Sequence, residues 1–338
     1  MLVRKKLQIL KTFTLARIWN FGLLKLSYTL SIWTKKPIHW GNPIAISIEP
    51  TTACNLKCPE CPSGLRQFTR ATGNLKPKIN TAILDSLGKD LQYINYYFQG
   101  EPFINPNFLD FVKAARAKNI YVLTSTNAHF ISPKIAAEVV ASGLSEMIVS
   151  LDGTTQETYE NYRIEGKLDT VLQGLKNIQA AKKEANVKHP IVSIQFLVTA
   201  QNEHQIPEVK TWVEKYGADN LNLKTIQVYN YEKGNRLIPK NEKYSRYKEK
   251  ADGTFALKNK MSNYCWRMWS TCVFTWDGTI VPCCFDKDAK YKMGEISKAE
   301  FQSIWKNGLY NDFRQKILKN RSEIDICQNC SEGSKIWI

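Results

Sequence analysis

Residues 54–61 read CNLKCPEC and place Cys54, Cys58 and Cys61 in a C-x3-C-x2-C spacing directly after an apolar run, AISIEPTTA. Three thiolates on one short loop can each bind a different iron of a four-iron cubane, which leaves the fourth iron open to another ligand. A structural zinc site or a fully ligated cluster needs four protein ligands, and no nearby Cys or His completes this set. The spacing therefore predicts an iron–sulfur cluster with one open position. A zinc site completed by a distant ligand is the alternative.

Composition narrows the class of protein. The 338 residues are 43% apolar and 11% aromatic, which predicts a folded chain rather than a disordered one. The nine cysteines fall in short spacings with no secretory signal ahead of them, so metal ligation in a reducing cytoplasm is favoured over disulfides. The net charge of +16 suits an acidic electron carrier or an anionic surface. Nucleic acid is disfavoured, because no nucleic-acid-binding motif accompanies the charge.

Six β-like runs alternate with helix-like segments along the middle of the chain. The runs lie at 45–49, 94–98, 121–125, 146–151, 191–198 and 221–228, and the helical patterns lie around 81–90, 107–118, 133–142, 168–184 and 204–216. Strands that alternate with helices predict βα units and a parallel sheet. In parallel α/β barrels the chemistry is found at the carboxyl ends of the strands. Polar residues at those ends are therefore the candidates for a binding site.

Several strand-like runs end in polar or glycine-containing motifs. The candidate residues there are Gly100, Glu101 and Pro102, then Asn127, then Ser150, Asp152 and the later Arg163, with Gln195 and Asn202 as weaker candidates. The guanidinium group of an arginine suits a carboxylate ligand because its planar donors reach both oxygens.

Together with the cysteine triad, these motifs resemble the radical SAM (S-adenosylmethionine) superfamily. In that family the open iron binds the amino and carboxylate groups of SAM, and one electron cleaves SAM to a 5′-deoxyadenosyl radical. Gln99-Gly100-Glu101-Pro102 resembles the family's GGEP motif, with Gln99 in place of the first glycine. The resemblance implies a partial (β/α)6 TIM-like barrel in which the candidate residues above contact SAM. One departure is Glu60, because the residue before the third cysteine is usually aromatic or apolar.

Six further cysteines follow the barrel-like part: Cys265, Cys272, Cys283, Cys284, Cys327 and Cys330. This pattern resembles the SPASM and shortened twitch domains that carry auxiliary iron–sulfur clusters. A two-cluster version needs more cysteines, so the resemblance implies one auxiliary [4Fe–4S] cluster, held by Cys265, Cys283, Cys327 and Cys330. A hairpin turning at 276–278 would bring the first two together. A zinc ion held by four thiolates is the alternative.

Cys272 and Cys284 are left outside that set of ligands. As thiols without a metal they are expected to be small buried hydrophobic residues. Cys284, which neighbours a predicted ligand, is also a weak candidate for hydrogen transfer to or from the substrate.

The expected organisation has four parts. Residues 1–43 form a basic amphipathic helical segment, 44–235 the barrel, 236–263 a linker or bridging region, and 264–338 the auxiliary cluster domain. The first segment contains no acid before Glu49, and its longest uncharged run, between Lys25 and Lys35, is too short to span a bilayer. It is expected either to pack on the barrel or a second subunit, or to lie in a membrane interface.

Three functions are weighed on these patterns. The resemblance to twitch-domain dehydrogenases implies two-electron oxidation of a sugar, a cyclitol or a related alcohol. A SPASM-type maturase that modifies a ribosomal peptide or protein is the alternative. A non-enzymatic zinc- or iron-binding module that docks nucleic acid or membrane leaves the strand-end motifs unexplained. The expected enzyme is cytoplasmic or peripheral on the inner membrane surface, with flavodoxin or ferredoxin as its electron donor.

Overall fold

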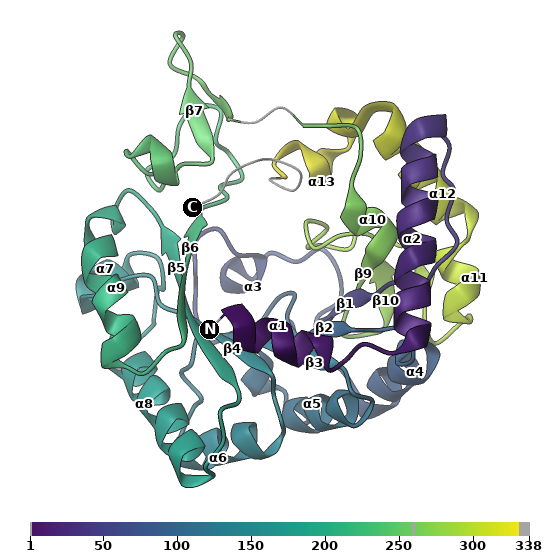
Figure 1. Ribbon diagram of the computed structural model, residues 1–338. Helices are drawn as coiled ribbons and strands as arrows, with labels where there is room; N and C mark the ends of the chain where they lie inside the picture. Colours follow the sequence, from purple (N-terminus) through teal and green to yellow (C-terminus); the bar gives the residue numbers. More distant parts are fainter. Residues whose placement is uncertain (1, 259–260, 331–338) are drawn as a thin grey trace.

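A curved parallel sheet forms the centre of the molecule (Figure 1). The computed structural model describes residues 2–258 and 261–330. Within them, six parallel strands pair in chain order. They are β1 (Ala45–Ile48), β2 (Tyr93–Asn95), β3 (Tyr121–Thr126), β4 (Glu146–Ser150), β5 (Ile191–Val198) and β6 (Asn220–Thr225). The predicted six-unit parallel sheet is confirmed.

Helices cover the outer face of this sheet. They are α4 (Pro77–Leu87), α5 (Phe108–Ala117), α6 (Pro133–Ala141), α8 (Leu168–Glu184) and α9 (Ile206–Lys215). α8 shows why: Leu168, Val171, Leu175 and Ile178 recur at helical spacing and are all buried, so one stripe of the helix faces the sheet. α6 begins sharply because Ser132 accepts a hydrogen bond from the amide of Ile135, a typical N-cap.

The C-terminal cysteine-bearing part extends the same sheet. β9 (Thr271–Phe274) pairs in parallel with β1, and β10 (Thr279–Val281) returns antiparallel to β9 and carries β11 (Gly294–Glu295) on its other side. The predicted hairpin turn is confirmed, with Gly278 at a φ of 84°. Four helices complete this part: α10 (Trp266–Ser270), α11 (Phe301–Trp305), α12 (Gly308–Asn320) and α13 (Asp325–Gln328).

The segment between the two parts is more ordered than its polar composition indicates. β7 (Tyr247–Glu249) and β8 (Phe255–Leu257) form a separate two-stranded hairpin. Tyr247 is buried and stacks on Tyr231 with ring centroids 4.6 Å apart. This stacked pair, the hydrogen bonds of the Tyr247 hydroxyl with the backbone of Val228 and a small apolar cluster hold the hairpin against the chain that leaves β6. The expected linker or bridging region is therefore a small bridging element.

Two N-terminal helices, α1 (Leu2–Leu10) and α2 (Leu15–Thr34), pack on the barrel. α1 crosses the amino ends of the strands (Figure 1), where Lys5 pairs with Glu146 at 2.7 Å and Arg4 with Asp219 at 3.0 Å. Packing on the barrel, one of the two expectations for this segment, is therefore observed. None of the described helices is long and apolar enough to cross a membrane.

The buried side chain of His39 predicts that the folded protein loses stability in acid. Burial and the nearby charge of Arg314 lower the pKa of His39 from 6.5 to about 3, and its Nε2 lies 2.9 Å from the carbonyl oxygen of Trp269. The folded protein therefore holds this ring neutral while the unfolded chain protonates near pH 6.5, so stability is lost as pH falls through that window. We expect the free energy of unfolding to drop by about 1–2 kcal/mol between pH 7 and pH 5 from this residue.

Urea unfolding of the protein and of His39→Gln at both pH values measures this effect. Glutamine can still donate to the Trp269 carbonyl but does not titrate. An equal pH dependence in the two proteins would contradict the assignment.

Candidate active site

The three cysteines of CNLKCPEC lie on the loop that leaves the carboxyl end of β1. A buried ion pair fixes the start of this loop: Glu49 accepts two hydrogen bonds from Arg70, at 2.6 and 2.8 Å, and a third from the amide of Trp276 at 3.2 Å. Burial raises the pKa of Glu49, and the hydrogen bonds from Arg70 oppose that rise. The pair ties the cysteine loop to the hairpin of the C-terminal part.

Hydrogen-bond donors lie close to two of the three sulfurs. Asn127 Nδ2 is 3.9 Å from Cys54 Sγ, and Arg163 Nη1 is 3.7 Å from Cys58 Sγ. Burial raises the pKa of Cys54 to about 12 and that of Cys58 in the same direction. Such thiols become thiolates when a metal supplies positive charge. Donors near the sulfurs suit cluster ligands, because hydrogen bonds to sulfur adjust cluster potentials.

The arrangement fits a cluster better than a single ion. Among residues 2–258 and 261–330, no three His, Cys, Asp or Glu side chains converge closely enough to hold one metal ion. Ligands of one zinc ion all lie about 2.0–2.3 Å from it, whereas the three cysteines of an open cubane bind three different irons.

The Gly100-Glu101-Pro102 turn lies directly against the cysteine loop. Gly100 has a φ of +73°, and a Cβ there would meet the carbonyl oxygen of Thr51 at 2.3 Å. Its amide donates to Ser63 Oγ at 2.9 Å, and the amide of Glu101 donates to the carbonyl of Ala53 at 2.8 Å. Only glycine combines this backbone angle with this close approach.

The Glu101 carboxylate joins the ends of β2 and β3. It accepts from Thr126 Oγ1 at 2.7 Å, from the Asn127 amide at 2.7 Å and from the Phe103 amide at 3.4 Å. A carboxylate has about four acceptor positions, so one remains for a ligand ammonium. Burial raises the pKa of Glu101 to about 7, and these hydrogen bonds oppose the rise.

Arg163 and Asp152 form a second buried pair at the end of β4. Arg163 Nε lies 2.5 Å from Asp152 Oδ2, and the other oxygen of Asp152 accepts the amide of Leu197 at 2.6 Å. Asp152 has no exposed surface. It therefore positions Arg163, whose guanidinium reaches Cys58. Ser150 is buried beside it at the strand end, and the side chain of Asn202 donates to the carbonyls of Asp152 and Leu197.

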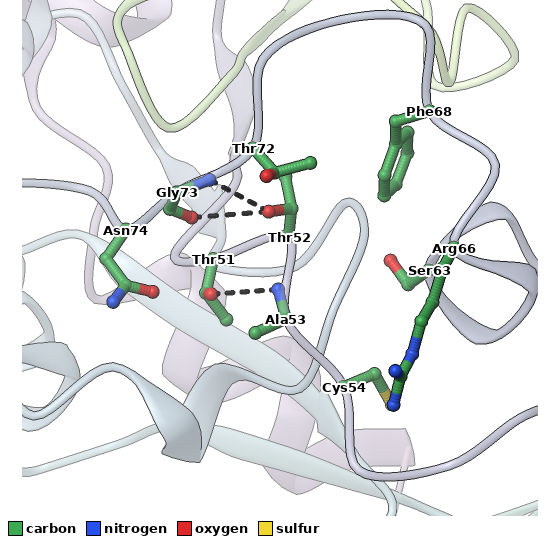
Figure 2. A pocket seen from close by; sticks show the side chains of 10 residues that line it. All are labelled: Thr51, Thr52, Ala53, Cys54, Ser63, Arg66, Phe68, Thr72, Gly73 and Asn74. Carbon is green, nitrogen blue, oxygen red and sulfur yellow. Dashed lines mark hydrogen bonds between the residues drawn. The ribbon is translucent and has the colours of Figure 1, made fainter.

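A cavity of about 500 Å³ opens beside Cys54. Figure 2 shows Arg66 extending toward Cys54 and Phe68 facing the same space, with Ser63 between them. The sequence reasoning missed Ser63 and Arg66, although both closely follow the third cysteine. The sequence carries no signal for these two residues. The short helix α3 (Pro62–Leu65) ends at Arg66 with a left-handed φ of 55°, which only the structure reveals.

Glu60, the departure from the family pattern, has a structural partner. Its Oε2 accepts the amide of Tyr229 at 3.0 Å, and its Oε1 accepts Asn235 Nδ2 at 3.3 Å. A charged residue at this position therefore connects the cysteine loop to the chain that leaves β6.

The second cysteine set gathers around a buried arginine. Arg321 is 1% exposed and its Nη2 lies 3.2 Å from Cys330 Sγ. Burial opposes its charge, but the thiols of Cys265, Cys330 and Cys327 together raise the pKa of Arg321. The pKa of Cys283 is raised by a hydrogen bond with Cys284 and by burial, and the nearby thiol of Cys265 contributes in the same direction. Cys265, Cys327 and Cys330 thus lie near the same arginine, and Cys283 lies near Cys265. As ligands of one cluster these four stay a prediction.

The two remaining cysteines differ in their surroundings. Cys272 is fully buried in the main core, as expected for a small hydrophobic residue. Cys284 packs against Phe98, Val273, Val281 and Ala289, a small cluster that joins the barrel to the C-terminal part. Its role in hydrogen transfer stays a prediction.

Comparison with known proteins assigns the family. The model of the radical SAM superfamily matches residues 48–213, and that of the iron–sulfur cluster-binding SPASM domain matches residues 265–331. The chain belongs to the radical SAM superfamily. It is therefore an enzyme with a SAM- and [4Fe–4S]-binding domain followed by a domain that binds auxiliary iron–sulfur clusters. The non-enzymatic alternative is excluded.

Relatives of this radical SAM enzyme align over most of both chains. It is 27% identical over 299 residues to the mycofactocin maturase MftC of Mycobacterium tuberculosis, covering 81% of this chain and 73% of that one. It is 23% identical over 319 residues to the PqqA peptide cyclase of Gluconobacter oxydans, covering 87% and 84%. The solved structure of BtrN in complex with AdoMet and 2-DOIA has a TM-score of 0.55 at 20% identity, covering 87% and 94%, and shares the fold.

Arg163 provides a test of the SAM contacts. We expect Arg163→Lys to weaken SAM binding about tenfold without loss of iron, because lysine cannot reproduce the two-point contact of a guanidinium with a carboxylate. Equilibrium dialysis under anaerobic conditions gives the affinity, and iron analysis gives the cluster content. Asp152→Asn, which keeps the acceptor but removes the charge, should show a smaller loss. If Arg163→Lys binds SAM as tightly as the wild type, Arg163 does not bind SAM and its role is the ion pair with Asp152.

Proposed function

We propose that this radical SAM enzyme is a maturase that modifies a ribosomally made peptide. Alignment over most of both chains with the PqqA peptide cyclase and with MftC supports a peptide substrate over a sugar or cyclitol. The dehydrogenase hypothesis was based on the number of C-terminal cysteines. Only the fold shared with BtrN supports it. SAM and its reduced cluster supply a 5′-deoxyadenosyl radical that abstracts hydrogen from a substrate C–H bond.

In this proposal the two cysteine sets hold two clusters. Cys54, Cys58 and Cys61 hold the SAM-binding cluster, and Cys265, Cys283, Cys327 and Cys330 hold the auxiliary one. Glu101 receives the SAM ammonium with its remaining acceptor position, while Arg163 orients the carboxylate. Gly100 allows the turn that carries Glu101 to lie directly against the cysteine loop. The domain limits 1–43, 44–235, 236–263 and 264–338 are part of the proposal, with β9 joining the last domain to the barrel sheet.

The geometric support is a second cavity, lined by the chain that follows β6 and by residues of the C-terminal part. It has a volume of about 800 Å³, in the upper part of the range for ligand sites. One wall includes Tyr229, whose amide is bound by Glu60, the neighbour of Cys61. The lining also includes Phe285 and Ile326, the neighbours of Cys284 and Cys327. In this proposal a peptide segment binds in this cavity, near residues that neighbour cysteines of both sets.

The electron donor proposed for the enzyme is flavodoxin or ferredoxin. The net charge of +16 favours an acidic carrier through electrostatic complementarity. A cytoplasmic location fits nine cysteines without a disulfide among the described residues, because reducing conditions preserve thiolate ligands.

Iron content tests the two cluster sites separately. The anaerobically reconstituted protein is expected to carry about eight irons if both clusters are cubanes. Replacing Cys54, Cys58 and Cys61 together by alanine should remove about half of them and abolish formation of 5′-deoxyadenosine from SAM and dithionite. Replacing Cys327 and Cys330 should remove the other half and preserve SAM cleavage.

Cys272→Ala is the matched control, since this thiol lies in the apolar core and should leave all irons in place. A colourless wild-type protein with one or two zinc ions would overturn both cluster sites.

The substrate class can be tested without knowing the substrate. We expect an extract of deuterium-grown cells to transfer deuterium into 5′-deoxyadenosine, seen by mass spectrometry as a gain of one mass unit. Protease treatment of the extract beforehand should abolish the transfer if the substrate is a peptide. Transfer that survives the protease but is lost when small molecules are removed by dialysis would favour the sugar or cyclitol alternative and refute the maturase proposal.

A further inference from the structure

The amphipathic pattern of α2 is turned away from the barrel. Its buried face consists of Arg17, Asn20, Leu24, Ser27 and Ser31, so four of the five residues are polar. A surface helix normally buries its apolar stripe and exposes its polar one. Here the opposite holds, and the apolar stripe of α2 is left to solvent.

Polar contacts hold much of α2 in this orientation, and Tyr28 adds edge contacts with the rings of Trp266 and Trp269. Arg17 is 3% exposed and donates five hydrogen bonds to backbone carbonyls. Four of these carbonyls, at residues 88, 89, 118 and 119, follow the ends of α4 and α5. The last carbonyls of a helix lack partners and carry partial negative charge. Asn20 and Ser31 add bonds to the backbone of Asn42 and Ile38.

The exposed face is strongly apolar and aromatic. Leu15 is 87% exposed, Trp33 84%, Trp19 71% and Leu26 53%, and they recur at helical spacing along α2. α1 and the turn after it add Leu7, Leu10 and Phe13. Of the large hydrophobic side chains exposed in the described part of the chain, more than half lie between residues 7 and 33. A patch this concentrated marks an interaction surface.

The charge around this face indicates the kind of partner. Residues 1–48 contain eight Lys and Arg and no Asp or Glu. Arg4, Lys5 and Arg17 are used against the barrel, whereas Lys6 within α1 and Lys11, Lys35 and Lys36 just after the two helices are exposed. Two copies of this chain would bring the same basic surface against itself in a two-fold dimer. An anionic surface complements the charge instead.

We propose that the outer face of α1 and α2 docks on an anionic lipid bilayer. Tryptophans and leucines enter the interfacial region while the lysines meet lipid headgroups, a mode of binding that requires no membrane-spanning helix. The proposal is independent of the reaction that the enzyme catalyses. It also orients the molecule. α1 covers the amino ends of the strands, so the cysteine loop after β1 points away from the lipid, toward the cytoplasmic electron donor and substrate.

Vesicle sedimentation of the full-length protein tests the proposal. We expect the protein to co-sediment with vesicles of phosphatidylcholine and phosphatidylglycerol, and to bind pure phosphatidylcholine about tenfold more weakly. Trp19→Glu combined with Trp33→Glu should lower binding to the mixed vesicles by about tenfold or more. Both side chains are exposed, so circular dichroism and the thermal midpoint should stay unchanged.

The control is Leu309→Glu, which adds one negative charge, as each single tryptophan substitution does, at a leucine that is 57% exposed on α12, and it should bind like the wild type. A second variant, Lys35→Glu with Lys36→Glu, should weaken binding and reduce its dependence on salt. Equal binding by the tryptophan variant, or no binding by the wild type, would overturn the proposal. So would a concentration-dependent dimer, seen by light scattering without vesicle binding and lost in the tryptophan variant.

Discussion

The close contact between the turn after β2 and the loop after β1 is the constraint on which the site depends. Gly100 lies so near the carbonyl of Thr51 that no side chain fits, and the neighbouring amide donates to Ala53. The Glu101 carboxylate then continues the connection to Asn127 at the end of β3, which in turn donates toward Cys54. Three strand ends are thus joined through one glycine and one carboxylate. Because backbone atoms make most of these contacts, the loop position is set before any cofactor binds.

Two buried ion pairs serve this geometry rather than stability. Desolvation offsets much of the attraction within a buried pair, so its contribution to folding free energy is small or uncertain in sign. Removing one partner, however, leaves an unpaired buried charge. Glu49 with Arg70 and Asp152 with Arg163 therefore fix positions: the first holds the start of the cysteine loop, and the second holds a guanidinium against Cys58.

The barrel was predictable because its signals are local. Apolar runs of strand length and helical periodicity recur every unit, and the triad and the Gly-Glu-Pro turn are short contiguous motifs. The partners of Glu60 were not predictable, since Asn235 lies 175 residues away and neither residue carries a pattern of its own. The same holds for the positioning role of Asp152, whose burial depends on β5. The polar composition of the bridging region concealed the β7–β8 hairpin, because scattered residues such as Tyr231, Tyr247 and Phe255 pack together there rather than a contiguous apolar run.

The N-terminal segment shows why net charge alone is a poor guide to partners. Its sequence reads as one basic amphipathic stretch, yet the structure divides the cations between two tasks. Arg17 satisfies carbonyls at the ends of α4 and α5, where a lysine could not reach as many acceptors from one position. Arg4, Lys5 and Arg17 already bind groups of the barrel. The exposed lysines and tryptophans are therefore the residues that can contact another molecule. A helix that is held to the protein by polar bonds can leave its apolar side exposed. The buried Arg17 and the exposed tryptophans therefore both follow from the way α2 is oriented on the barrel.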